Sequence, residues 1–153
     1  MSFLIVTILA TDYFDPPYWI APMPKLYQLV CFSRLAPDMS PTCVAGIVRA
    51  TRSLNEARQI SSLLVFDGAH FCHYIEGHAV DVTALAERIR ADTRHADFQL
   101  LHQAEFEGPP LVAGRSLDYA LSYEDSLEDF EKVRGAEAVH LLKKLLPTLD
   151  REP

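Results

Sequence analysis

The sequence predicts an α+β domain whose strands and helices follow in the order β-α-β-β-α-β. Three observations lead to this order. First, apolar, β-prone runs occur at four places. Second, two stretches with apolar residues at helical spacing lie between these runs. Third, Asp67-Gly68 forms a two-residue turn of the kind that joins a hairpin. The predicted fold is the ferredoxin-like sandwich, an antiparallel sheet with two helices on one face.

The first strand and helix lie in the residues that follow Met23. The run Leu26–Ser33 is apolar and β-prone, which predicts a strand. Ser40 followed by Pro41 is typical of a helix start, because serine caps the helix and proline suits its first turn. A helix is therefore expected over Pro41–Leu54, with an apolar stripe of Val44, Ile47, Val48 and Thr51.

The hairpin and the second helix come next. Strands are expected over Ile60–Phe66 and Ala69–Glu76, on either side of the Asp67-Gly68 turn. A second helix ends near Asp92, and its apolar stripe consists of Val82, Leu85, Ala86 and Ile89.

Two further strands complete the sheet. A fourth strand is expected over Phe98–Phe106, and the break at Gly108-Pro109-Pro110 separates it from an additional strand over Arg115–Leu121.

The two ends are expected to lie outside the domain, which we place at residues 23–122. Residues 1–22 contain the apolar run Phe3–Ala10, too short to span a bilayer, and no basic residue precedes it as in a secretory signal. Either the true start is Met23 and residues 1–22 are a misassigned extension, or they add a small edge strand. Residues 123–153 form a C-terminal extension with two short amphipathic helices between Glu124 and Leu146, whose apolar faces must cover the sheet or a partner.

Composition limits the functions that this chain can have. Its 153 residues suit one domain, and the 49% hydrophobic and 23% charged residues are ordinary globular values. The net charge of −7 disfavours binding to nucleic acid or to an anionic membrane. Three widely spaced cysteines, Cys31, Cys43 and Cys72, indicate reduced thiols and hence a cytoplasmic protein.

The sequence contains no known catalytic motif, so we do not expect an enzyme. Cys31 and His73 lie on different predicted strands and could meet, but a nucleophilic pair or a metal site lacks a third residue. A more favourable arrangement lies between the two helices. A flat apolar ligand would fit between Ile47 and Ile89, with Asn55, just beyond the first helix, and Arg94 binding its polar edge.

These residues resemble the BLUF family, the bacterial blue-light sensors that use flavin, from about Leu26 to Leu121. The segment Leu26-Tyr27-Gln28-Leu29-Val30-Cys31-Phe32-Ser33 matches the family's first strand. The segment Phe71-Cys72-His73-Tyr74-Ile75-Glu76-Gly77 is similar to the family pattern F-L-Q-x-L-E-G, and Asp92-Thr93-Arg94-His95 to D-x-R-H. The resemblance implies a ferredoxin-like domain that holds the isoalloxazine ring of FAD between its two helices.

The resemblance also assigns roles to individual residues. Asn55 matches the asparagine that hydrogen-bonds the flavin ring, and Ile47 and Ile89 match its apolar walls. Arg88 falls on the phosphate side. The polar residues around the ring edge and ribityl chain correspond to Asp92, Arg94 and His95.

The departures from the family concern the photochemical switch. Cys31 stands at the position of the photoactive tyrosine and His73 at that of the glutamine. The turn G-I-T-G becomes Gln59-Ile60-Ser61-Ser62, and Tyr119 takes the place of a tryptophan. The resemblance therefore implies a FAD-binding sensory domain with a lost or altered photocycle.

Two alternatives remain open at this stage. A flavin-free interaction module could keep the fold and signal through its C-terminal helices, as a homo-oligomer or with a partner protein. An acylphosphatase-type enzyme shares the topology, and Arg34 after the first strand would be its phosphate-binding residue, although no glycine-rich loop accompanies it.

Overall fold

A computed structural model describes residues 25–153 except 113 and 125. The prediction that residues 1–22 are separable lies outside the described residues. The described helices and strands are, in order, β1 (Leu26–Leu35), η1 (Pro41–Cys43), α1 (Val44–Arg58), β2 (Ser61–Phe66), β3 (His70–Gly77), α2 (Ala79–Ala91), β4 (His95–Phe106), β5 (Asp118–Leu121), η2 (Leu127–Lys132), α3 (Ala136–Leu145), η3 (Leu146–Thr148) and β6 (Asp150–Arg151).

The six strands form one sheet in the order β4-β1-β3-β2-β5-β6. Strands β1, β2, β3 and β4 together with helices α1 and α2 confirm the ferredoxin-like prediction. The sheet is mixed and not wholly antiparallel, because β5 runs parallel to β2. After β4 the chain reverses and crosses to the far edge, so it meets β2 in the same direction. The short β6 then pairs antiparallel with β5.

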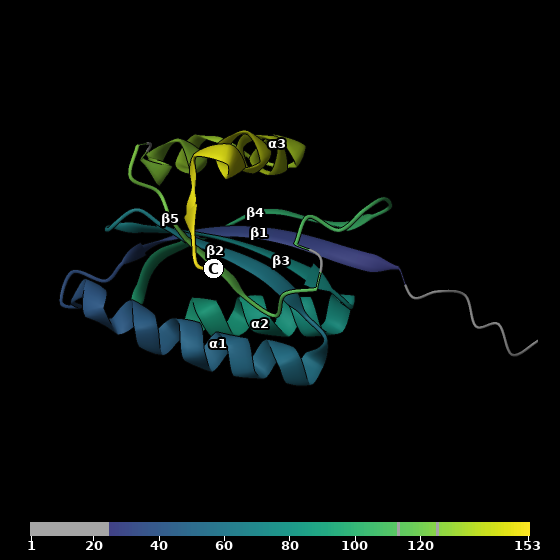
Figure 1. The fold of residues 1–153 in the computed structure, drawn as a ribbon, viewed down its shortest axis with the longest axis horizontal. Helices are drawn as coiled ribbons and strands as arrows, with labels where there is room; N and C mark the ends of the chain where they lie inside the picture. Colours follow the sequence, from purple (N-terminus) through teal and green to yellow (C-terminus); the bar gives the residue numbers. More distant parts are fainter. Residues whose placement is uncertain (1–24, 113, 125) are drawn as a thin grey trace, which may run out of the picture.

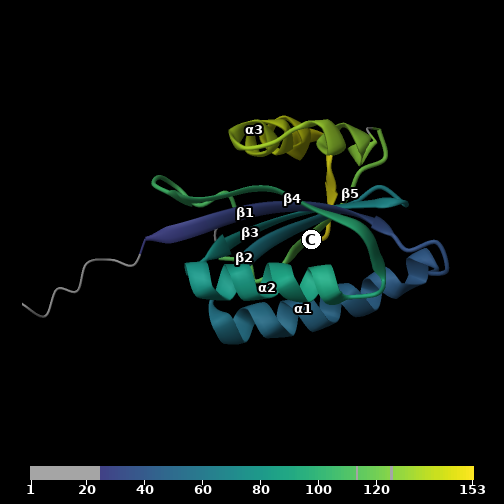
Figure 2. The ribbon, with the colours of Figure 1, turned by 180° about the vertical axis from the view of Figure 1, so that it is seen from behind.

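Helices cover both faces of the sheet, as Figures 1 and 2 show. The helices α1 and α2 lie on one face, and α3 lies on the other. Successive side chains of a strand point to opposite faces of the sheet, so each strand contributes residues to both packed layers. Leu29 and Cys31 of β1 pack in one cluster with α2, whereas Val30 and Phe32 pack in another with α3.

The C-terminal extension covers its own sheet, which answers the question that the sequence left open. Its first predicted helix is the 3-10 helix η2, and its second is α3, whose apolar residues Ala138, Val139, Leu142 and Leu145 are all buried. An exposed apolar stripe was our reason to expect a partner here, and the structure removes that reason.

Asp67 of the β2–β3 turn ties the extension to the domain. Its carboxylate accepts hydrogen bonds from the backbone N–H of Leu127 at 2.9 Å and from His70 Nδ1 at 2.9 Å. Burial alone would raise the pKa of Asp67, but the backbone N–H groups and the His70 ring outweigh it and lower this pKa. The carboxylate therefore links the β2–β3 hairpin to the start of η2.

Two predicted boundaries are wrong in ways that affect the site. Asn55, expected beyond the first helix, lies inside α1 and is fully buried, because the helix continues to Arg58 and ends at Gln59 with a left-handed φ of 54°. The fourth strand, expected from Phe98, begins at His95, shortly after α2 ends at Ala91. Among the described residues, no helix is both long and apolar enough to cross a membrane.

Candidate functional site

A cleft of about 120 Å³ opens between α1 and α2 above the middle of the sheet. Its walls come from both helices, and its floor and one end come from β3, β4 and the turn before β4. The lining residues are Ile47, Ala50, Thr51, Leu54, His73, Leu85, Arg88, Ile89, Asp92, Arg94 and His95.

The cleft contains seven of the nine residues that the sequence assigned to a flavin site. The seven are Ile47, His73, Arg88, Ile89, Asp92, Arg94 and His95. Cys31 and Asn55 lie outside its lining, both fully or almost fully buried. The sequence reasoning therefore brought together residues that are far apart in the chain but close in the fold.

The apolar walls of the cleft consist of residues from both predicted helical stripes. Ile47 of α1 and Ile89 of α2 are buried and line the cleft. Thr51 and Leu85, which the sequence placed on the same stripes, line it as well. Leu54, seven residues after Ile47, extends the wall of α1, and helical spacing from Ile47 would have found it.

The polar end of the cleft is organised by the Asp92–Arg94 ion pair. Arg94 Nε donates to both carboxylate oxygens of Asp92, at 2.9 and 3.1 Å, and Arg94 Nη2 donates to Oδ2 at 2.6 Å. These hydrogen bonds lower the pKa of Asp92 despite its partial burial. Arg94 Nη1 reaches α1, where it would lie 3.7 Å from a Cβ on Gly46. The guanidinium therefore closes one end of the gap between the helices.

His95 connects this polar end to the sheet. Its Nδ1 lies 2.8 Å from Ser33 Oγ of β1, and its ring packs on Phe71 of β3 with centroids 4.6 Å apart. Burial lowers the pKa of His95. The ring is thus fixed between two strands at the edge of the cleft.

Cys31 and His73 are direct partners across the antiparallel β1–β3 pair. Directly opposite residues project to the same face, here the face covered by α1 and α2. Burial raises the pKa of the Cys31 thiol to about 12 and lowers that of His73 to about 3, the latter with a contribution from His95. Both side chains are therefore neutral, and they do not form the thiolate–imidazolium pair of a cysteine nucleophile.

The buried His73 predicts a pH dependence of stability. The unfolded chain binds a proton at this residue below its usual pKa of 6.5, but the folded chain does not until about pH 3. Stability is therefore lost as the pH falls below 6.5, by on the order of 1–2 kcal/mol at pH 5. Chemical denaturation of His73→Gln at pH 7 and pH 5 should show a smaller loss than the wild type.

The matched control for this measurement is His140→Gln, since His140 is exposed on α3. This variant should keep the wild-type difference between pH 7 and pH 5. Equal pH dependence in both variants would contradict the assignment to His73.

Two buried polar side-chain atoms have no hydrogen-bond partner among the described residues, Asn55 Oδ1 and His73 Nε2. They belong to α1 and to the strand beneath the cleft, the two elements that the predicted ligand would contact. A buried polar atom without a partner costs about 1–3 kcal/mol. Of the two residues, His73 lines the cleft, so its unpartnered Nε2 favours a ligand that carries a polar group.

The residues around the cleft fit a flavin in chemistry, but the volume is small. Apolar walls, two imidazoles and an Arg–Asp pair suit a flat heteroaromatic ring. Ligand pockets usually measure roughly 300–1,000 Å³, and this cleft measures about 120 Å³. A tricyclic ring would therefore enter only when α1 and α2 move apart or the isoleucine side chains turn away.

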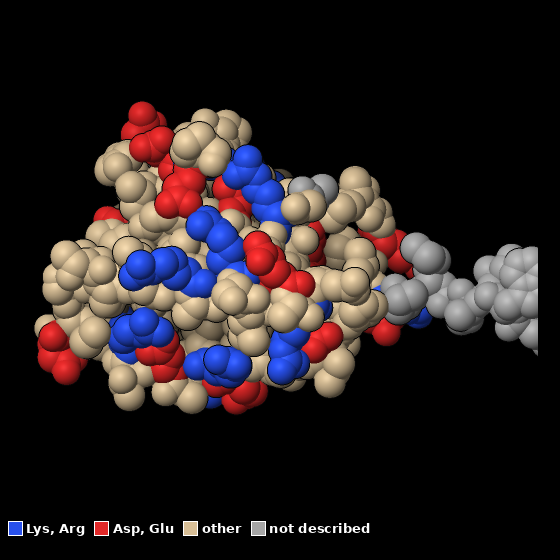
Figure 3. All heavy atoms as spheres, turned by 60° about the horizontal axis from the view of Figure 1, so that its bottom comes forward, with Lys and Arg blue, Asp and Glu red and all other residues tan. Residues whose placement is uncertain are grey.

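The face formed by α1 and α2 is more basic than the whole chain. The two helices carry five arginines and three acidic residues, within a protein of net charge −7. Figure 3, in which the bottom of Figure 1 is brought forward, shows basic side chains across this face, with acidic ones between them. Arg88 lines the cleft, is exposed, and forms no ion pair with any residue that the structure describes. It is thus free to bind a phosphate group.

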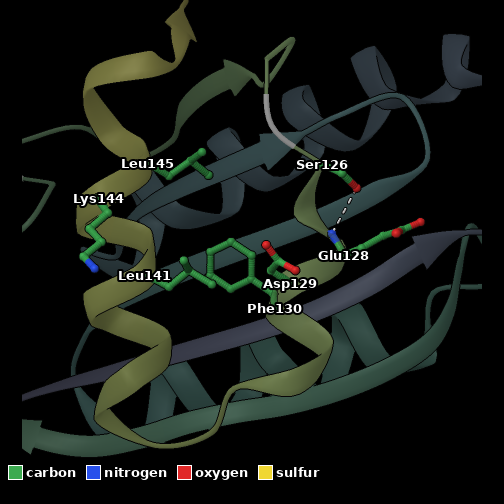
Figure 4. Close-up of a pocket in the computed structure, with 7 residues that line it drawn as sticks. All are labelled: Ser126, Glu128, Asp129, Phe130, Leu141, Lys144 and Leu145. Carbon is green, nitrogen blue, oxygen red and sulfur yellow. Dashed lines mark hydrogen bonds between the residues drawn. The ribbon is translucent and has the colours of Figure 1, made fainter.

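A second hollow, of about 310 Å³, lies between η2 and α3 on the opposite face of the sheet (Figure 4). Phe130, Leu141 and Leu145 form its apolar part, and Asp129 and Lys144 lie at its rim. It contains none of the nine predicted residues, and neither of the two unpartnered atoms lies in it. The predicted site residues therefore gather at the cleft between α1 and α2 and not at this hollow.

The structure gives the acylphosphatase-type alternative no support at Arg34. Its guanidinium forms ion pairs with Glu131 and Asp97, so carboxylates take the place of the expected phosphate. No group of three or more potential metal ligands occurs within the described part of the chain.

Comparison with known proteins points to one family. The family model "Sensors of blue-light using FAD" matches residues 26–109. Among solved structures, the dark-state structure of the BLUF protein BlrB is 25% identical with a TM-score of 0.67, and the match covers 81% of this chain and 96% of BlrB. No curated protein matches the sequence.

Two larger proteins contain a similar domain. A bacterial light-regulated adenylyl cyclase is 17% identical with a TM-score of 0.60, over 80% of this chain and 36% of its own. Klebsiella pneumoniae BlrP1, solved with FMN and cyclic diGMP, is 23% identical with a TM-score of 0.57, over 70% of this chain and 30% of its own. The chain therefore spans about a third of the length of these two proteins, and at these identities they support the fold alone.

Proposed function

The chain belongs to the BLUF family of blue-light sensors that use FAD, and from this premise we propose that it binds flavin between α1 and α2 and has an altered light response. The observation that carries the proposal is the convergence of seven predicted residues on one cleft whose floor contains the unpartnered His73 Nε2. FMN and riboflavin are acceptable substitutes for FAD, since the ring makes most of these contacts.

Each part of the cleft would hold a different part of the flavin. Ile47 and Ile89 would enclose the ring, Asn55 would hydrogen-bond its polar edge, and His73 would offer one further hydrogen bond from β3. Asp92, Arg94 and His95 would surround the ring edge and ribityl chain. Arg88, at the exposed mouth, would bind the phosphate side. The bound flavin supplies absorption of blue light.

Binding should depend on Asn55. Asn55→Ala should weaken binding of FAD by about tenfold or somewhat more, since a neutral hydrogen bond contributes about 0.5–1.5 kcal/mol net and its loss leaves the group on the ligand buried without a partner. The measurement is flavin absorbance after gel filtration, followed by fluorescence titration of each variant. Gln103→Ala, which removes an exposed amide on β4, is the matched control and should bind like the wild type.

A specific result would refute the proposal. If the wild-type protein, incubated with excess FAD, shows no flavin absorbance after gel filtration, the cleft is not a flavin site. A loss of binding in Gln103→Ala equal to that in Asn55→Ala would show that the effect is not specific to the cleft.

A flavin-free interaction module is the second candidate, and two observations favour it. The cleft is small, and the amide donors of Asn55 are already bound within the protein, to Ser62 Oγ at 2.9 Å and the Ser116 carbonyl at 2.7 Å. The same absorbance measurement separates the two candidates, because only the first predicts a yellow protein.

We also propose how the chain is organised around this site. Residues 23–122 form the sensory domain, residues 1–22 are dispensable for its fold, and residues 123–153 carry the signal to a partner protein or a second copy in the cytoplasm. The Asp67–Leu127 hydrogen bond supports this path, since it links the β2–β3 hairpin to η2. The domain itself performs no catalysis in this proposal.

A further inference from the structure

Strand β4 contains one residue more than β1 where the two strands pass the polar end of the cleft. Phe32 pairs with Gln99 and Arg34 pairs with Ala96, so two steps along β1 correspond to three steps along β4. This shift of register is a β-bulge, which inserts one extra residue into one strand of a pair. Asp97 lies in the bulge and has a left-handed φ of 51°.

The extra residue determines which face of the sheet His95 meets. Directly opposite residues project to the same face, and successive residues of a regular strand alternate between the faces. Gln99 lies opposite Phe32, which packs in the cluster with α3. Strict alternation from Gln99 would place His95, four residues earlier, on that same face. With the bulge, His95 lies opposite Leu35, which packs with α1, and it lines the cleft.

His95 finds its two contacts only on this side of the sheet. Its Nδ1 lies 2.8 Å from Ser33 Oγ, and its ring packs on Phe71 with centroids 4.6 Å apart. The carboxylate of Asp97 contributes little to this arrangement, because its side chain is 70% exposed and its ion pair with Arg34 spans 3.7 Å near the surface. The backbone conformation of Asp97 is therefore the important feature. Aspartate adopts a left-handed φ more readily than most other residues with a side chain.

We propose that Asp97 is a positioning residue of the cleft, since its left-handed conformation absorbs the extra residue of β4 and thereby directs His95 to the face of α1 and α2. This inference rests on the proposed flavin site, where His95 lies near the ring edge and the ribityl chain. Asp97 does not line the cleft and acts only through His95.

Variants at position 97 separate backbone conformation from side-chain chemistry. Asp97→Gly and Asp97→Asn accept a left-handed φ and should keep His95 in place. Asp97→Val should turn residue 97 to the extended conformation, because a β-branched residue rarely adopts a positive φ, and should rotate His95 away from the cleft. Gln103→Val is the matched control, since Gln103 is exposed and regularly paired on the same strand.

Deletion of Asp97 gives the opposite expectation from Asp97→Val. Without this residue, the steps along β1 and β4 are equal between the Phe32–Gln99 and Arg34–Ala96 pairs. Regular alternation then places His95 on the cleft face without any left-handed residue. The deletion variant should therefore behave like the wild type.

The first measurement uses the ligand-free protein. Nuclear Overhauser contacts between the rings of His95 and Phe71 should be present in the wild type, Asp97→Gly, Asp97→Asn, the deletion variant and Gln103→Val. They should be lost in Asp97→Val. Circular dichroism of this variant should remain native, because the Asp97 side chain is exposed. If Asp97→Val does not fold, the deletion and glycine variants still decide the result.

The second measurement is a fluorescence titration with FAD. Asp97→Val should weaken binding as much as His95→Ala, by about threefold to tenfold, the effect of one lost neutral hydrogen bond. The double variant should bind no more weakly than either single variant, because both changes remove the same contact.

The outcomes distinguish this inference from the proposed function. A retained His95–Phe71 contact in Asp97→Val, or its loss in the glycine or deletion variant, would overturn the positioning role whether or not flavin binds. Additive losses of FAD binding in the double variant would show that Asp97 does not act through His95. Absence of FAD binding by the wild type, together with the expected contacts, would overturn the flavin site and leave the positioning of His95 intact.

Discussion

Replacing Glu76 by alanine should lower the free energy of unfolding by about 3–5 kcal/mol. Glu76 lies at the end of β3, is almost fully buried, and accepts three hydrogen bonds. Its Oε2 accepts from the Tyr74 hydroxyl at 2.8 Å and from the Leu111 N–H at 3.1 Å, and its Oε1 accepts from the Val112 N–H at 3.1 Å. Removal of the carboxylate leaves these donors buried without an acceptor, at about 1–3 kcal/mol each.

The effect should be large because Glu76 holds the chain between β4 and β5. The backbone of residues 111 and 112 lies between these two strands, where the chain crosses to the far edge of the sheet. Without the carboxylate this segment loses its attachment to β3. The placement of β5, and of Ser116 just before it, should loosen as well.

Urea denaturation monitored by circular dichroism measures the prediction. Tyr74→Phe, which removes one of the three donors, should cost only about 1 kcal/mol. Glu105→Ala on β4 is the control for loss of a carboxylate, because Glu105 is exposed and forms its ion pair with the exposed Lys25; its effect should stay within about 0.5 kcal/mol. A loss in Glu76→Ala no greater than that in Tyr74→Phe would show that the two backbone contacts contribute nothing.

Local sequence patterns were sufficient for the ferredoxin-like part of the fold. The hairpin lies where Asp67 and Gly68 predict it, and apolar residues at helical spacing place α1 and α2. Its register differs from the prediction, because Phe66 pairs with Phe71 and not with Ala69, as a turn of Asp67 and Gly68 alone would require. Such patterns were insufficient where contacts between residues distant in sequence determine the structure. The parallel position of β5 depends on a crossing that Glu76 holds, and Asn55 remains helical because Gln59 adopts the left-handed conformation that ends α1.

The site divides in the same way. Family resemblance and helical spacing placed Ile47, Ile89 and the Asp92–Arg94 pair on one cleft. The hydrogen bonds that hold Asn55 were not predictable, because Ser62 and the Ser116 carbonyl come from elements 7 and 61 residues away in sequence. A sequence also does not give the volume of a cleft, so the narrowness of this cleft is seen only in the structure.

The opposed pair Cys31 and His73 makes the strongest functional prediction. The flavin-loaded wild-type protein should show no reversible red shift of its absorption under blue light. By resemblance, the family's response needs a tyrosine that gives an electron and a proton to excited flavin and a glutamine that then rearranges. Cys31 has no phenol, and burial keeps its thiol protonated with a pKa of about 12. His73 has no carboxamide to exchange a carbonyl for an amide, although its neutral ring offers one hydrogen bond.

The measurement is a light-minus-dark difference spectrum, and the decisive variant is Cys31→Tyr with His73→Gln. Since the two positions are directly opposed on β1 and β3, the new side chains would project together toward α1 and α2. The double variant should therefore regain a red shift. Tyrosine is larger than the buried cysteine and will strain the core, so His73→Gln alone, which nearly keeps the volume, shows separately whether the fold and flavin binding survive.

Cys72→Ser, on the opposite face of β3, is the control for loss of a thiol and should leave the spectrum unchanged. A reversible red shift in the wild type would refute the prediction. A flavin-loaded double variant without one would place the loss elsewhere, in the Gln59–Ser62 turn that holds Asn55 or at Tyr119 of β5.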